Sequence, residues 1–235
     1  MLSFIIIGLF CRNLLIEISC ACIQSVGKGN TTLIEFQYKR EKENILISLK
    51  TDSTQIGTFH RIATIIYALK MDILSGELST VIEKGREFTI DSFILQADGG
   101  DTTQAAFKLG MMMDSLFSKN TKFEEILEKL QIQEPAIATF FRETPEFIFS
   151  DLPERSETCL YLESSAGRGL LYYVSRILMQ NQINIRSATI ETDFETGRAK
   201  DSFYLTDASG KMFASSDLAD KIRKEILAPI QSNSR

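Results

Sequence analysis

A glycine-containing loop that runs directly into an apolar helix pattern is the first candidate for chemistry in this chain. Residues 166–192 read AGRGLLYYVSRILMQNQINIRSATIET, and apolar side chains follow Gly169 at helical spacing. The first backbone N–H groups of a helix have no partner within the helix, so they attract phosphate or carboxylate groups. A glycine in front of them lets a ligand approach the backbone closely. The loop is therefore either a phosphate-binding turn of a nucleotide enzyme or a turn that serves another role.

A second glycine-rich stretch, SVGKGNTT at 25–32, does not fit a nucleotide site. A phosphate loop places Lys and then Ser or Thr directly after its last glycine, so that both reach the phosphates from a helix start. Here Lys28 precedes Gly29, and residues typical of a strand follow. This order predicts a hairpin turn.

Acid–base and metal chemistry have few candidates. The one histidine, His60, lies in a helix pattern, and we interpret it as exposed or interfacial rather than catalytic. The four cysteines lack the C-x-x-C spacing of zinc and dithiol sites, which favours a reducing compartment and packing as small hydrophobic side chains. We therefore expect no catalytic residues, no cofactor and no metal site. An enzyme of an unfamiliar type is the remaining alternative.

The charge balance argues against nucleic acid as a partner. The net charge is -5 and the pI is near 5.1, and no basic stripe interrupts the sequence. The apolar run near the N-terminus is shorter than a membrane span and is followed by Arg12 and Glu17. We predict a cytoplasmic protein and interpret residues 1–23 as a loosely ordered extension rather than a membrane anchor.

The chain repeats itself. Residues 56–80 align with residues 168–192 without a gap at an offset of 112, which places Gly57 over Gly169. Further on, Asp91-Ser92-Phe93 recurs as Asp201-Ser202-Phe203 at an offset of 110. The hairpin between the two motifs is therefore two residues shorter in the second copy. A repeat of this kind must be recognised before any fold is assigned.

Each copy shows the order strand, helix, strand, strand, helix. This order predicts an α+β protein of two ferredoxin-like βαββαβ repeats with antiparallel sheets, each lacking its last strand. Strand patterns at 32–39 and 146–150 precede the two copies. We hypothesise an exchange, in which the strand at 146–150 completes the first copy and the strand at 32–39 crosses over to complete the second. The predicted divisions are an extension at 1–30, a first repeat at 31–120, a helical linker at 121–145 and a second repeat at 146–230.

The glycine, the Leu-Leu pair, the apolar helix and the strand INIRSATIET together resemble the ACT domain, a small ligand-sensing module. The resemblance is to the tandem ACT pair that ends the bacterial nitrogen-sensing (PII) uridylyltransferases, and it covers roughly 31–119 and 146–229. It implies that amino acids bind where two such units pack side by side, at the loop before the first helix. Carried over by position, the candidate ligand-binding residues are Thr54, Gln55, Ile56, Gly57, Ala166, Gly167, Arg168, Gly169, Leu170, Asn184 and Ile185.

The loops depart from the family pattern. Thr54 and Ala166 stand where the family has an acidic residue, and Ile56 and Arg168 stand where it has proline. The ammonium group of an amino acid would therefore lack its expected carboxylate, while Arg168 is either an anion-attracting group or a solvated side chain. The catalytic parts of the uridylyltransferases have no visible counterpart in the chain.

These patterns predict a non-catalytic regulatory protein that binds an amino acid or a related small metabolite. The alternative is a protein–protein interaction module that has lost its ligand. Exposed sheet edges or helix faces would support a homodimer or a regulated protein partner.

Overall fold

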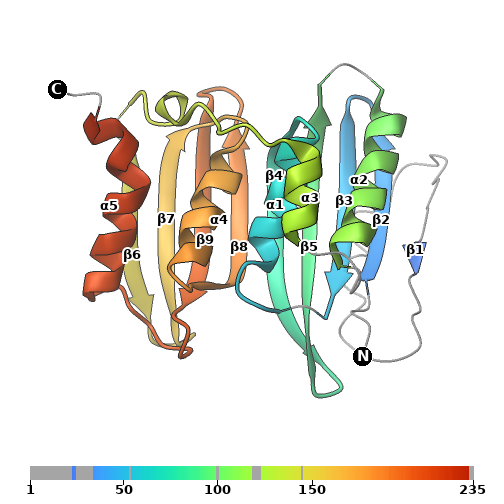
Figure 1. Ribbon diagram of the computed structural model, residues 1–235. Coiled ribbons are helices and arrows are strands. Elements are labelled where there is room, and N and C mark those ends of the chain that lie inside the picture. Colours follow the sequence, from blue (N-terminus) through green and yellow to red (C-terminus); the bar gives the residue numbers. More distant parts are fainter. Residues whose placement is uncertain are drawn as a thin grey trace.

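Nine strands of the described residues form one antiparallel sheet, which helices cover on one face (Figure 1). The computed structural model describes residues 23–24, 34–52, 54–98, 101–117, 123–143 and 145–232. The strand order is β1-β2-β3-β5-β4-β8-β9-β7-β6. The strands are β1 (Ile23–Gln24), β2 (Ile34–Glu41), β3 (Asn44–Thr51), β4 (Met71–Glu83), β5 (Arg86–Ala97), β6 (Glu146–Leu152), β7 (Glu157–Ser165), β8 (Asn184–Asp193) and β9 (Arg198–Thr206). The helices are α1 (Thr58–Ala68), α2 (Thr102–Phe117), α3 (Phe123–Leu130), α4 (Leu170–Gln180) and α5 (Asp217–Ser232), with a 3-10 turn at Ile137–Thr139.

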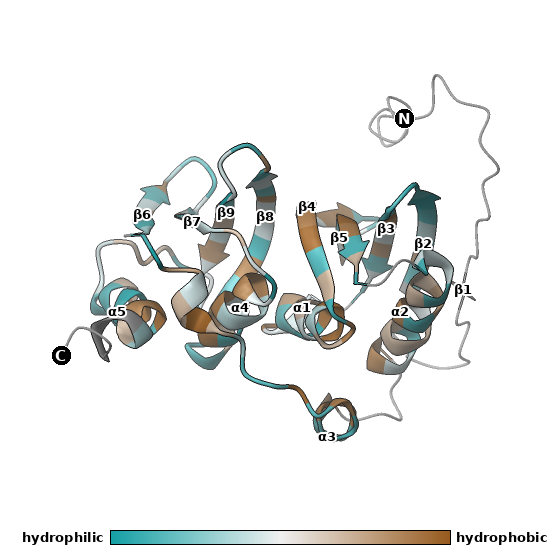
Figure 2. Cartoon of the chain, turned by 90° about the horizontal axis from the view of Figure 1, so that it is seen from above, coloured by the Kyte–Doolittle hydropathy of each residue, from teal (hydrophilic) through white to brown (hydrophobic). Residues whose placement is uncertain are grey.

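The predicted α+β class and the two ferredoxin-like repeats are confirmed. The first repeat runs β2-β3-α1-β4-β5-α2 and the second runs β6-β7-α4-β8-β9-α5, so the element order is the same in both. Within β3, every second side chain points toward the helices and is buried, as at Ile45, Ile47 and Leu49. The helices carry the matching apolar stripe, and the view along the sheet shows α1, α2, α4 and α5 on the same side (Figure 2). α3 lies farther from the sheet than α1.

The hypothesis of an exchanged terminal strand is wrong. β2 pairs with β3 of its own repeat from Ile34↔Thr51 to Glu41↔Asn44, and β6 pairs with β7 of its own repeat. A short hairpin keeps consecutive strands adjacent, whereas an exchange would require long connections to close. β2 and β6 thus occupy the sheet position of the last strand of a βαββαβ unit. In the chain, however, each is the first strand of its repeat rather than the last.

The two repeats are joined edge to edge. β4 pairs with β8 from Ser75↔Glu191 to Ser79↔Ser187. By the offset of 112, Ser75 corresponds to Ser187 and Ser79 corresponds to Glu191, so the repeat relation exchanges the first pair with the last. The joint therefore has local two-fold symmetry. Above it α1 packs against α4, where the rings of Tyr67 and Tyr172 stack at 5.0 Å.

Two other predictions fall largely outside the described residues. The hairpin turn at 25–32 is among them, as is the extension at 1–30 except for β1, which pairs with β2. Cys11, Cys20 and Cys22 are also outside, while Cys159 is a half-buried free thiol.

Candidate functional site

The two predicted ligand loops both lie at the joint between the repeats. Gly57 opens α1 with φ 89°, and Gly169 opens α4 with φ 94°. This left-handed conformation suits glycine, because a Cβ would crowd the backbone. No side chain caps either helix N-terminus, but the first N–H of each helix donates to a loop carbonyl, Thr58 to Gln55 and Leu170 to Gly167. That leaves the next N–H groups, at residues 59–60 and 171–172, for an anionic group.

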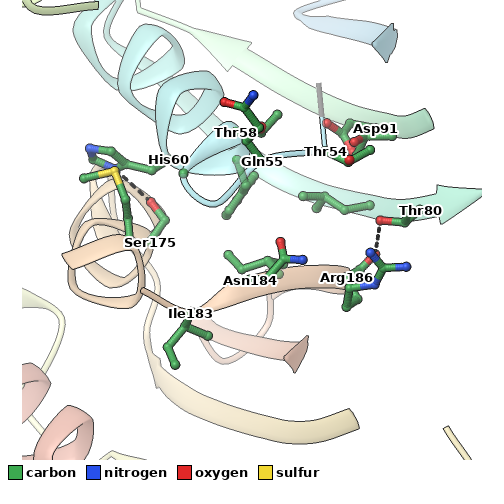
Figure 3. A pocket seen from close by; sticks show the side chains of 16 residues that line it. Thr54, Gln55, Thr58, His60, Thr80, Asp91, Ser175, Ile183, Asn184 and Arg186 are labelled. Atoms are coloured by element: carbon green, nitrogen blue, oxygen red, sulfur yellow. Dashed lines mark hydrogen bonds between the residues drawn. The ribbon is translucent and has the colours of Figure 1, made fainter. Parts of the chain in front are cut away.

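A hollow of about 460 Å³, open solvent included, lies at the start of α1 (Figure 3). Asp91 and Thr54 both line it, and the His60 ring lies 3.2 Å from the Ser175 hydroxyl across the joint between the repeats. Both repeats form its wall. The first repeat contributes Thr54, Gln55, Gly57, Thr58, Phe59, His60, Leu78, Thr80, Thr89 and Asp91, and the second contributes Ser175, Met179, Ile183, Asn184, Ile185 and Arg186.

A second hollow of about 430 Å³, measured the same way, lies at the start of α4. Its wall comes from the second repeat with Ala166, Gly167, Arg168, Gly169, Leu170, Leu171, Tyr172, Ile190, Thr192, Ala199 and Asp201, and from the first repeat with Ala63, Ile66, Tyr67, Met71 and Ile73. Most of the residues that line the two hollows are repeat equivalents of one another. For example, Gly57, Thr80 and Asp91 of the first correspond to Gly169, Thr192 and Asp201 of the second. The two hollows are therefore equivalent sites about the two-fold joint.

The structure brings ten of the eleven predicted ligand residues into these hollows. The first hollow takes Thr54, Gln55, Gly57, Asn184 and Ile185, and the second takes Ala166, Gly167, Arg168, Gly169 and Leu170. Ile56 is not part of either wall. Asn184 and Ile185 belong to the second repeat, yet they face the loop of the first because β4 and β8 are paired.

Sequence reasoning missed the buried carboxylates of Asp91 and Asp201. Asp91 is 0% exposed and Asp201 is 1% exposed. Within the described chain, neither carboxylate has a hydrogen-bond partner. Burial raises the pKa of Asp91 to about 8 and that of Asp201 to about 7. The Glu191 backbone N–H opposes the shift at Asp201 but does not reach hydrogen-bond geometry.

A signal for these aspartates was present in the sequence. Strand alternation places Asp91 on the face of Phe93 and Leu95, which is the core face, and Asp201 on the face of Phe203. An acidic residue in that position in both copies marks a site, because a buried carboxylate is costly without a partner.

Arg168 does not have a free guanidinium. It donates to both oxygens of Asp72, at 3.0 and 2.7 Å, and to Asp98 at 2.6 Å. These carboxylates belong to the first repeat, so Arg168 links the repeats at the edge of the second hollow. Its charge is balanced there, which weakens the interpretation of Arg168 as an anion-attracting group.

His60 is interfacial. It is 4% exposed, lies 3.2 Å from the Ser175 hydroxyl and stacks on Tyr172. Burial, assisted by the charge of Arg176, lowers the pKa of His60 to about 4, so the ring is neutral at pH 7.

Two wider properties concern the described residues alone. None of their helices has the length and apolar character that a membrane crossing requires. Among the same residues, no three His, Cys, Asp or Glu side chains cluster as metal ligands.

Known proteins resemble this chain in sequence, although no protein-family model matches it. Bifunctional uridylyltransferase/uridylyl-removing enzyme of Pseudomonas putida (strain W619) is 24% identical over 153 residues, which are 65% of this chain and 17% of the relative. The protein of the same name in Erythrobacter litoralis (strain HTCC2594) is 25% identical over 173 residues, 73% of this chain and 18% of the relative. The predicted resemblance to the uridylyltransferases is confirmed. The chain spans about a sixth of the length of these relatives.

A solved aspartate kinase from Synechocystis is a weak structural neighbour of this chain. The superposition covers 82% of this chain and 28% of the kinase, at 9% sequence identity and a TM-score of 0.46.

Proposed function

We propose that this tandem ACT-like chain is a non-catalytic regulatory protein of the cytoplasm, which senses an amino acid or a related small metabolite. The observation that supports the proposal is the pair of equivalent hollows, each walled by both repeats. A ligand in either hollow would contact both repeats at once. Its binding energy would therefore favour one arrangement of the joint over others, which is the thermodynamic basis of a sensor.

The chemistry of the walls suits a small polar ligand. An uncapped helix N-terminus favours a carboxylate. In the first hollow the hydroxyls of Thr54 and Thr80 donate to Glu87 and to the Arg186 carbonyl, and a hydroxyl that donates can still accept a hydrogen bond. The second hollow has a more apolar loop, with Ala166 and Leu170 where the first has Thr54 and Thr58. We expect the first hollow to bind polar amino acids more tightly than the second.

A protein-binding role is the second candidate. Phe107 and Met111 lie one turn apart on α2 and are 60% and 54% exposed. Exposed apolar neighbours of this kind suit a partner surface. A regulated protein or a second copy of the chain could pack there, with or without a ligand in the hollows.

Thermal unfolding of the full chain with each of the twenty amino acids and their 2-oxo acids tests the sensing proposal. A compound at one hundred times its dissociation constant should add about 2.7 kcal/mol to the free energy of unfolding. Thr80→Phe should block the first hollow and Thr192→Phe the second, because both side chains line the walls.

Val81→Phe is the matched control, since the neighbouring side chain points to the other face of the same strand. It should leave the thermal shift unchanged. If no compound shifts the unfolding temperature, the sensing proposal fails and the protein-binding candidate gains support.

A further inference from the structure

The carboxylates of Asp91 and Asp201 are unusual features of the core. Each lies on the helix-facing side of a central strand and lines a hollow, and each lacks a hydrogen-bond partner within the described residues. Native proteins rarely leave a buried polar group unpaired, and an uncompensated carboxylate is among the most costly. The same arrangement at equivalent positions of both repeats indicates a shared purpose.

The basic side chains of the hollows do not serve these carboxylates. In the first wall Arg186 donates instead to Glu87, at 3.2 Å, and His60 is neutral. In the second wall Arg168 is engaged by Asp72 and Asp98. Among the described lining residues, no cation is therefore placed to balance Asp91 or Asp201.

We infer that Asp91 and Asp201 each bind the ammonium group of an amino acid, while the neighbouring helix N-terminus binds its carboxylate. This inference rests on the proposed function and specifies its ligand class as a zwitterion. Asp91 and Asp201 are the only acidic residues among the described residues that line the two hollows, so they supply the negative charge there. Burial raises the pKa of both aspartates, and a bound ammonium ion favours their ionised form.

Matched ligand pairs separate this role from a purely structural one. The probes are L-alanine with L-lactate, L-aspartate with L-malate, and L-phenylalanine with L-phenyllactate, in which a hydroxyl replaces the amine. Titration calorimetry on the wild-type full chain should show the amino acid of a binding pair to be about 10- to 100-fold tighter, the usual effect of a charged hydrogen bond. A protonated aspartate that donates to the ligand would instead favour both members alike.

Asp91→Asn and Asp201→Asn test the two residues separately. Each single substitution should remove one of two binding sites per chain, and the double variant should bind no amino acid of the panel. Ser92→Ala and Ser202→Ala are matched controls, because each is the next residue of the same strand and faces the open side of the sheet. Thermal unfolding of every variant checks that it is folded.

The outcomes are distinct. If none of the twenty amino acids or their 2-oxo acids binds the wild type, the proposed function fails and this inference fails with it. If the hydroxy acids bind as tightly as the amino acids, or if the folded double variant keeps wild-type affinity, the ammonium assignment alone is overturned. The comparison of amine and hydroxyl probes uses the wild type, so it decides the question even if an asparagine variant does not fold.

Discussion

Asp91 and Asp201 place carboxyl groups among the hydrophobic side chains beneath the helices. Folding removes both groups from water, and this desolvation raises their pKa values to about 8 and about 7. Between about pH 4 and these values the unfolded chain is ionised while the folded chain holds the protons. The folded state therefore binds more protons, and its stability falls as the pH rises through this window.

The first residue-scale prediction follows from Asp91. Asp91→Asn has no titrating group, so its free energy of unfolding should decline less between pH 5 and pH 8.5 than that of the wild type. By pH 8.5 the wild type should have lost more of its free energy of unfolding than Asp91→Asn, by an amount on the order of a few kcal/mol. Urea denaturation at several pH values measures it.

Two comparisons make the pH measurement decisive. Ser92→Ala should run parallel to the wild type, because it keeps Asp91 in place. His60, with a pKa lowered to about 4, costs stability as the pH falls from about 6.5 toward 4, and it does so in all variants. Parallel curves for wild type and Asp91→Asn would show that Asp91 does not titrate as described.

At the scale of elements, each helix-opening glycine is covered by the other repeat. A Cβ at Gly57 would lie 2.9 Å from the Met179 sulfur, and one at Gly169 would lie 2.8 Å from both the Tyr67 ring and the Pro135 Cβ. Tyr67 and Met179 are repeat equivalents, so the contact is reciprocal. Helix, loop and opposing helix thus close each hollow together.

Alanine at these glycines should therefore destabilise the protein, and Gly169→Ala should do so more than Gly57→Ala. Both substitutions suffer a positive φ, at about 1–2 kcal/mol, and overpacking adds about 1–3 kcal/mol. A methionine side chain can move aside more easily than a tyrosine ring against a proline. Thermal or urea unfolding gives the ranking.

Gly85→Ala and Gly197→Ala are the controls for backbone strain. Both glycines have positive φ, at 77° and 67°, but a Cβ there would meet nothing within 4 Å. Alanine at these two positions should therefore lower the free energy of unfolding only by the cost of the positive φ, about 1–2 kcal/mol. Equal losses at all four positions would mean that packing across the joint contributes little.

At the scale of the whole molecule, the two repeats are complete units that share one sheet. β6 pairs within the second repeat, and the segment between the 3-10 turn and β6 packs there too, since the rings of Phe141 and Tyr173 lie 6.4 Å apart. A chain of residues 134–235 therefore contains every strand of its own half. It lacks only β4 and α1, which cover β8 and α4.

We expect this fragment to fold and to self-associate through β8 and α4. An uncovered strand edge and helix face attract a second copy, and the joint is already two-fold in symmetry. Circular dichroism and light scattering test the two halves of the prediction. An unfolded fragment would contradict this prediction and show that the second repeat depends on β4 and α1 for its stability.

Some features of this fold can be predicted from the residues alone, and others require the tertiary structure. Periodicity and turn residues lie close together in the chain, so the sequence predicts α1, α4, the hairpins and the repeat offset. The partner of β6 could not be read in this way, because strand pairing depends on how far each connection must reach. Nor could the sequence assign Asn184 to the loop of the other repeat.

The buried aspartates show the same limit at the candidate site. Their alternation with Phe93 and Phe203 indicates a core face, and that much is local. That each carboxylate ends in a hollow, with the nearby arginines engaged elsewhere, depends on contacts across 70 or more residues of chain, such as Arg168 with Asp98 and Arg186 with Glu87. The sequence by itself determined the two repeats and their glycine loops. The tertiary structure decided what faces those loops, because pairing β4 with β8 places each repeat's residues in the site of the other.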